Sequence, residues 1–149
     1  MANQTRLWYK IPSQNSKCAT TSNTITGLTE TCTVVSSTAS TDIWFGSSGS
    51  LLPGFTAKIV SAEGKEITEY GQPGELVVQS PSVVLGYLNN DKANAETFIA
   101  DTDGKGRWMR TGDEAVFRKA PSGNEHLFIT DRIKELIKVK VSPLLSSSR

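Results

Sequence analysis

The chain has 149 residues, of which 37% are hydrophobic and 21% are charged, so it can form the core of one domain of ordinary size. Its formal net charge is +1 and it has no polybasic run, which argues against nucleic acid or an anionic membrane as the main partner. No apolar run is long enough to span a bilayer. Cys18 and Cys32 lack the spacing of a metal site or redox pair, so we expect free thiols in a reducing compartment.

The N-terminal part of the chain is poorly patterned. Asn, Gln, Ser, Thr and Lys dominate residues 1–24, and this composition predicts weak order. No hydrophobic stretch typical of a secretory signal follows the N-terminus, so we expect an intracellular protein. Threonine and serine are frequent over residues 25–41, where Val34-Val35 predicts a short strand.

A glycine-punctuated loop over Phe45–Gly54 precedes a series of short strands. Alternating apolar and polar residues predict a strand over Phe55–Val60. After a turn, Glu66–Tyr70 is interpreted as the return strand, and Glu75–Ser80 is interpreted as a further strand. Backbone amides of the glycine-rich loop could face an anion, although a plain connector explains the same spacing.

The next part of the chain combines one helix with further strands. Asn90 or Asp91 is suited to cap a short helix over Lys92–Ile99. Strands follow around Ala115–Phe117 and His126–Ile129, and a hairpin-type loop separates them. Short strands at regular spacing with one helix predict a mixed α+β, mostly β fold, arranged as a small β-rich subdomain of distorted, barrel-like form.

The segment Trp108–Asp113 is the first candidate for a binding function. Asp113 follows Gly112 at the predicted start of a strand, where a glycine neighbour lets the carboxylate turn outward. A carboxylate so placed can accept hydrogen bonds from both hydroxyls of a ribose. The tripeptide is also an ordinary turn sequence, so both interpretations stay open.

A second candidate is the pair Thr29 and Glu30, which follows Gly27 by two residues. A threonine hydroxyl can donate to a phosphate oxygen, and a glutamate can hold Mg²⁺, which prefers oxygen ligands. A polar loop explains the same pattern. Arg132, after the last predicted strand, could contact a ribose or phosphate or form a surface ion pair. His126 is interpreted as structural, because no motif ties a nucleophile or carboxylate to it.

Taken in order, these segments resemble the AMP-forming acyl- and aryl-CoA ligases of the adenylate-forming superfamily, in the branch of coumarate–CoA ligase and luciferase. The resemblance runs from about residue 25 to about residue 140, which is a minor part of a full-length family enzyme. The segments that carry it are Gly27–Glu30, Gly46–Gly54, Gly74–Leu76, Gly86–Asn90, Thr97-Phe98, Trp108–Asp113 and Asp131–Lys138.

The resemblance implies a role for each candidate residue. Thr29 would contact the AMP phosphate, and Glu30 would bind Mg²⁺. Asp113 would hold the ribose hydroxyls, with Arg132 assisting from the other side. Thr26 stands where the family has an aromatic residue, which leaves stacking on adenine without its usual side chain.

The resemblance also implies two catalytic lysines and a division of the chain. Lys134 would be the hinge about which a small C-terminal domain rotates, and Lys138 would help to form the adenylate. The parts would be a non-matching segment at 1–24, a partial AMP-binding domain at 25–132, a hinge with the start of the small domain at 133–140, and a non-matching tail at 141–149. The family's lysine-bearing phosphate loop and most of its small domain are not found, so the resemblance implies a fragment truncated at both ends.

The implied reaction joins a carboxylic acid to ATP with Mg²⁺, giving an acyl-AMP and pyrophosphate, and then transfers the acyl group to coenzyme A. A carboxylate is a poor acyl donor, whereas the adenylate has a good leaving group, and cations neutralise charge on the reacting phosphate. A fragment is expected to be inactive alone. Two other classes stay open: a non-catalytic nucleotide-binding or protein-interaction pseudoenzyme, which could self-associate through exposed faces, and a fragment of an adenylation domain that loads a carrier protein.

The sequence leaves the acid substrate and the compartment open. The resemblance places the acyl pocket mostly upstream of this chain. Relatives in this family are often cytoplasmic or peroxisomal, and the terminal Ser147-Ser148-Arg149 is not the usual peroxisomal tripeptide.

Overall fold

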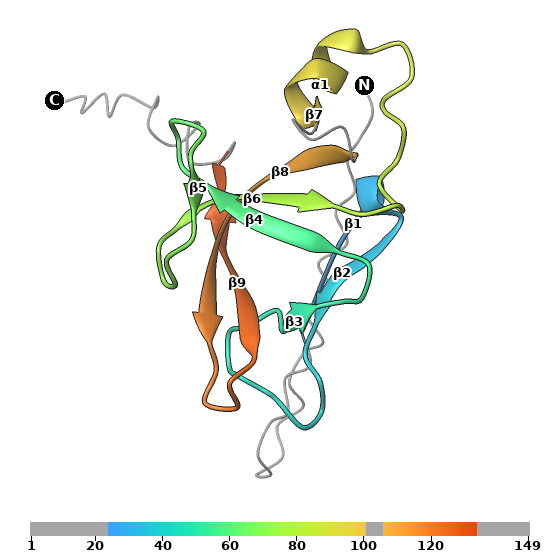
Figure 1. The fold of residues 1–149 in the computed structure, drawn as a ribbon. Coiled ribbons are helices and arrows are strands. Elements are labelled where there is room, and N and C mark those ends of the chain that lie inside the picture. The colour runs from blue at the N-terminus through green and yellow to red at the C-terminus, as the bar shows by residue number, and fades with distance from the viewer. Residues whose placement is uncertain (1–23, 101–105, 134–149) are drawn as a thin grey trace, which may run out of the picture.

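The computed structural model describes residues 24–100 and 106–133. Within these ranges the chain forms antiparallel strands in two sheets, with a short α-helix at one end of the larger sheet (Figure 1). The described ranges contain no helix that is both long enough and apolar enough to cross a membrane.

The smaller sheet has the strand order β1-β2-β3. β1 (Ile25–Leu28) pairs with β2 (Thr33–Ser37), and β2 pairs with β3 (Ser50–Leu51). A 3₁₀ helix, η1 (Thr29–Thr31), connects β1 to β2 and ends at Cys32, whose φ of 57° lies in the left-handed region. This tight connection places the predicted phosphate and magnesium residues in η1, at the end of the smaller sheet.

The larger sheet has the order β5-β4-β6-β8-β7, with β9 also paired to β8. Its strands are β4 (Thr56–Val60), β5 (Glu66–Ile67), β6 (Gly74–Gln79), β7 (Phe98–Ala100), β8 (Arg107–Lys119) and β9 (Glu125–Arg132). The long β8 pairs with β6, β7 and β9. The predicted mostly β fold is confirmed, and over the described strands neither sheet closes into a barrel.

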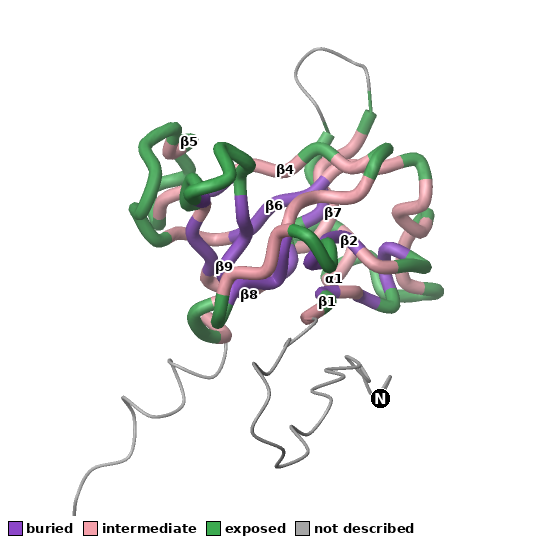
Figure 2. The backbone as a smooth tube through the Cα atoms, turned by 90° about the horizontal axis from the view of Figure 1, so that it is seen from below, coloured by how far each residue is buried: buried purple, intermediate pink, exposed green. Residues whose placement is uncertain are grey.

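The two sheets share one core and are joined by backbone hydrogen bonds. The Leu127 amide of β9 donates to the Gly49 carbonyl at 2.8 Å, and the Ser48 amide donates to the Leu127 carbonyl at 2.7 Å. Buried segments run through the middle of β6, β8 and β9 (Figure 2). The buried core residues are Leu28, Val35, Ile59, Leu76, Val78, Met109, Ala115 and Leu127.

Several predicted elements are confirmed with adjusted ends. The helix α1 (Asp91–Thr97) begins after Asn90, whose side chain accepts a hydrogen bond from the Ala93 amide at 3.1 Å. It ends two residues earlier than predicted, because Phe98 becomes extended and pairs with β8. The predicted return strand after Val60 is also shorter, since β5 keeps its pairing only over Glu66–Ile67.

Other strands were not predicted. β1 and β3 lie in segments whose composition is typical of polar or glycine-rich loops. The first half of β8, including Trp108–Asp113, was interpreted as a turn and the start of a strand. These segments become strands because they meet neighbours distant in sequence, an effect that local propensity does not contain.

Gly49 and Gly54 provide a matched pair that tests the joint between the two sheets. Both have positive φ, +84° and +89°, but a Cβ on Gly49 would overlap the Ser37 carbonyl, whereas Gly54 has no atom within 4 Å of that position. We predict that Gly54→Ala costs about 1–2 kcal/mol of unfolding free energy, from backbone strain alone. Gly49→Ala should cost roughly 3 kcal/mol more, because the backbone of β2 must move. Urea denaturation followed by tryptophan fluorescence measures both, and equal losses would contradict this close packing.

Candidate nucleotide site

Asp113 and Arg132 face each other across the β8–β9 pair. Asp113 lies in the middle of β8, not at its start as predicted, because the strand continues through Gly112 with φ of 71°. It is 1% exposed, and its Oδ1 lies 3.8 Å from the Arg132 Nε. The Arg132 side chain is 30% exposed, so its guanidinium reaches the surface while the carboxylate stays below it. The pair therefore joins a buried anion to a cation that solvent can reach.

The backbone that carries Asp113 is fixed by two side chains. The Thr111 hydroxyl donates to the Leu76 carbonyl at 2.8 Å and accepts from the Asp113 amide at 3.1 Å. Glu75 accepts from the Gly112 amide at 3.2 Å through Oε1 and pairs with the Arg110 guanidinium through Oε2. These contacts hold the strand against β6 and restrict the directions in which Asp113 can point.

Glu30 lies in η1 and is 6% exposed, while its neighbour Thr29 is exposed. The Tyr87 hydroxyl donates to the Glu30 Oε1 at 2.9 Å, and the Val84 amide donates to the Glu30 carbonyl at 2.8 Å. Both the side chain and the backbone of Glu30 are thus attached to the segment before α1. The exposed Thr29 beside a held carboxylate is an arrangement that can receive a phosphate and its cation.

The predicted site residues form two groups in the structure. In one, Asp113 contacts Arg132, and in the other, Glu30 contacts Tyr87. A packing path connects these groups. The Tyr87 ring packs against Phe98, with ring centroids 5.7 Å apart, and Phe98 pairs with Met109 of β8. Met109 and Asp113 lie on this one strand, four residues apart in the sequence. Lys134 and Lys138, the predicted hinge and catalytic lysines, lie outside the described residues.

Tyr87 has no role predicted from the sequence, although it lies in a segment that carries the family resemblance. The only signal was its place in Gly86–Asn90, which does not show that its hydroxyl reaches a residue 57 positions earlier. A separate pocket of about 300 Å³ is lined by Thr56, Gln79 and Arg107 with their neighbours and includes none of the predicted site residues. Among the described residues, no group of three or more His, Cys, Asp or Glu side chains could hold a metal ion.

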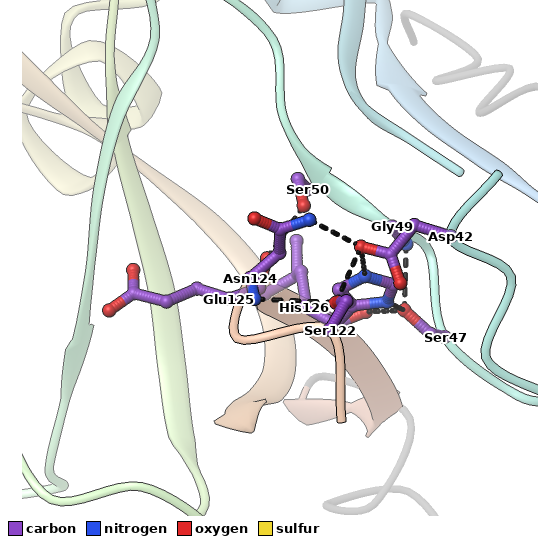
Figure 3. Close-up of polar contacts among 9 residues, drawn as sticks. Asp42, Ser47, Gly49, Ser50, Ser122, Asn124, Glu125 and His126 are labelled. Carbon is purple, nitrogen blue, oxygen red and sulfur yellow. Dashed lines mark hydrogen bonds and ion pairs between the residues drawn. The ribbon is translucent and has the colours of Figure 1, made fainter. Parts of the chain in front are cut away.

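His126 is hydrogen-bonded through both ring nitrogens (Figure 3). The Ser47 Oγ lies 2.9 Å from Nδ1, and the Asp42 Oδ2 lies 3.1 Å from Nε2. Ser122 and Asn124 also donate to the Asp42 Oδ2, at 2.9 and 2.6 Å. This agrees with the interpretation of His126 as a structural residue, and it shows two side-chain partners that no motif indicated.

The serine, histidine and aspartate of this cluster have the composition of a hydrolytic triad but not its arrangement. In such a triad the acid contacts Nδ1 and the serine contacts Nε2. Here the order is reversed, and Ser47 and His126 are each 1% exposed. The Ser47 Oγ also accepts from the Gly49 amide at 2.8 Å and lies 3.2 Å from the Leu127 carbonyl. The cluster therefore fastens the glycine-rich loop to the β8–β9 hairpin.

Comparison with known proteins indicates a family to which this chain is similar. The model for the family described as AMP-binding enzyme matches residues 18–88. The chain is 54% identical over 114 residues to the acyl-CoA ligase AFT1-1 of Alternaria alternata, a match that covers 76% of this chain and 20% of that protein. It is 48% identical over 119 residues to the acyl-CoA ligase easD of Emericella nidulans, covering 80% and 20%. The chain thus spans about a fifth of these curated relatives.

Solved structures give the same result for the fold. The long-chain-fatty-acid-CoA ligase FadD1 of Archaeoglobus fulgidus superposes with a TM-score of 0.62 and 28% identity, covering 78% of this chain and 23% of that chain. The anthranilate CoA ligase AuaEII, solved in complex with anthranoyl-AMP, superposes with a TM-score of 0.61 and 27% identity, covering 74% and 19%.

The Asp42 carboxylate gives the cluster a dependence on pH. The hydrogen bond from Asn124, and to a smaller extent that from His126, lowers the pKa of Asp42 from its ordinary value of 3.8. A lowered pKa in the folded state stabilises the fold above the unfolded pKa, and this stabilisation is lost as the pH falls through the folded value. We predict that Asp42→Asn lowers the midpoint of thermal unfolding at pH 7 and makes it less sensitive to pH below about 4.

Thermal melts at pH 7 and at steps below pH 4 measure this effect. Glu69→Gln, which removes an exposed carboxylate elsewhere on the surface, is the control and should leave the difference between neutral and acid midpoints unchanged. An Asp42→Asn protein with the same acid dependence as the unmodified chain would show that this carboxylate does not contribute.

Proposed function

We propose that the chain, which matches the family described as AMP-binding enzyme over residues 18–88, carries part of the nucleotide site of an acyl-CoA ligase. The observation that supports this most directly is the buried Asp113 paired with the partly exposed Arg132 across β8 and β9. A carboxylate fixed below a cation can accept from two vicinal hydroxyls, while the guanidinium offers donors to a ribose or phosphate oxygen.

The parent reaction would begin with the activation of a carboxylic acid. An oxygen of the substrate carboxylate attacks the α-phosphorus of ATP, the bond to the bridging oxygen breaks, and pyrophosphate leaves with its electrons. Asp113 and Arg132 would hold the ribose during this step, and the exposed Thr29 would donate to the α-phosphate. The residues thus position the nucleotide and stabilise its charge.

The second half-reaction would transfer the acyl group to coenzyme A. The sulfur of the thiol attacks the acyl carbon, the carbon–oxygen bond to AMP breaks, and the thiol proton passes to solvent. Lys134 would serve as the hinge between the two half-reactions, and Lys138 would help to form the adenylate in the first. Neither lysine lies in the described ranges, so their roles rest on the resemblance alone.

Glu30 fits a magnesium ion that the nucleotide largely holds itself. Mg²⁺ keeps several waters and is commonly bound by one or two carboxylates together with substrate phosphates. Glu30 supplies one carboxylate, and the described ranges contain no larger group of ligands that would form a cage for the ion. When bound, the ion would neutralise charge on the phosphates during transfer.

A second candidate function is self-association with another copy of this chain. Within residues 24–100 and 106–133, three large apolar side chains are strongly exposed: Phe45 at 88%, Leu85 at 92% and Leu88 at 91%. Leu85 and Leu88 flank Tyr87, so a second copy that covered them would also approach the Glu30 group. Size-exclusion chromatography distinguishes the candidates, since a monomer that binds nucleotide favours the first.

Nucleotide binding by the purified chain tests the first proposal. We predict that AMP binds measurably in calorimetric titration and that Asp113→Asn weakens binding by roughly 10- to 100-fold, the usual value of a hydrogen bond to a charged group. Asp91→Asn, at the exposed start of α1, is the control and should bind like the unmodified chain. Unchanged affinity in a folded Asp113→Asn protein would refute the assignment of the ribose site.

Catalysis by this chain alone tests the extent of the site. The chain spans about a fifth of its curated relatives, so we predict no pyrophosphate release above the blank with mixed fatty and aromatic acids, ATP and Mg²⁺. Robust turnover by the purified chain would show that the described residues and their flanks already form a complete active site.

A further inference from the structure

The carboxylate of Glu30 is held on one side only. Its Oε1 accepts a hydrogen bond from the Tyr87 hydroxyl at 2.9 Å, and no described residue donates a hydrogen bond to its Oε2. Glu30 is only 6% exposed, so the position of its side chain is defined by packing and by this one donor. A glutamate has three rotatable side-chain bonds, and a single well-placed donor removes much of that freedom.

Tyr87 is itself fixed by contacts unrelated to Glu30. The Asn94 side chain accepts from the Tyr87 amide at 2.6 Å and donates to the Tyr87 carbonyl at 2.9 Å. A Cβ on Gly86 would lie 2.8 Å from the Asn94 Oδ1, so the glycine leaves room for this clamp. The ring packs on Phe98 of β7, which lies beside α1 (Figure 1). The phenol is therefore presented to Glu30 from a rigid support.

We propose that Tyr87 is a positioning residue of the nucleotide site, which holds the Glu30 carboxylate so that its second oxygen is available to a magnesium ion on the ATP phosphates. This inference rests on the proposed function of Glu30. A donor that orients a metal-binding carboxylate reduces the freedom that the ligand loses on binding, and loss of such a donor typically weakens metal binding by about 10- to 100-fold.

The test measures how much Mg²⁺ strengthens ATP binding by the purified chain. Calorimetric titrations with ATP, with and without Mg²⁺, give two affinities whose ratio reports the contribution of the ion. We expect Tyr87→Phe to reduce this ratio by about tenfold while leaving the affinity without Mg²⁺ unchanged. Glu30→Gln should abolish the gain from Mg²⁺, because it removes the proposed ligand.

Tyr70 provides a matched control, since its hydroxyl also donates to a carboxylate, that of Glu125, away from η1. Tyr70→Phe should leave the ratio unchanged. Asn94→Ala provides a second variant, which releases the support of Tyr87 without touching its hydroxyl, and it should reduce the ratio to a smaller extent. Thermal melts of every variant confirm that the chain is folded.

The outcomes separate this inference from the function on which it rests. If a folded Tyr87→Phe protein keeps the full gain from Mg²⁺, or loses affinity for ATP equally with and without Mg²⁺, the positioning role is overturned. Neither result contradicts the assignment of the nucleotide site itself. If the unmodified chain gains nothing from Mg²⁺, the roles of Glu30 and Tyr87 both fail. AMP binding in the same samples then shows whether the Asp113 part of the proposal stands.

Discussion

The pairing of one long strand, β8, with three neighbours determines both the fold and the candidate site. Its first half lies between β6 and β7, and its second half pairs with β6 and β9. The strand thereby joins Met109 of the core, Thr111 as an anchor to β6, and Asp113 opposite Arg132. A site residue in the centre of a sheet is held more precisely than one on a loop, which suits the contact with two ribose hydroxyls that we propose for Asp113.

The two candidate carboxylates are buried at similar depth but are compensated differently. Asp113 has a cation beside it, and the attraction between opposite charges offsets the several kcal/mol that desolvation of an ion costs. Glu30 has a neutral phenol, which offers one hydrogen bond and no charge. A carboxylate with a neutral partner keeps more of its attraction for an added cation than one already paired with arginine. This difference agrees with a ribose contact for Asp113 and a metal contact for Glu30.

The sequence predicted those elements whose cause is local. α1 follows from the capping residue Asn90, β4 follows from alternating side chains, and β6 follows from the apolar run Leu76–Val78. β3 and β7 have two and three residues, too few for any periodicity, and they exist because β2 and β8 offer unpaired edges. The length of β8 was missed for a related reason, since Gly112 resembles a turn residue until its neighbour strands are known.

The candidate site shows the same division between local and distant causes. Asp113 and Arg132 were assigned one ligand from the resemblance, and the structure places them face to face. The Tyr87 contact to Glu30 and the Asp42 contact to His126 span 57 and 84 residues, and no local pattern encodes such distances. Such contacts can be identified only from the three-dimensional structure, or from a family pattern that assigns a role to each position.

The pairing of β8 with its neighbours limits where an insertion or deletion can be accepted in this part of the chain. Met109, Thr111 and Asp113 occupy every second position and all three are buried, and the register of β8 with β6 shifts across this stretch. An insertion or deletion of one residue between Met109 and Asp113 would shift Asp113 out of its pairing with Arg132. The exposed turn at residues 62–64, between β4 and β5, holds no site residue, so natural length variation should collect there and spare the six residues from Trp108 to Asp113, despite their resemblance to a flexible turn.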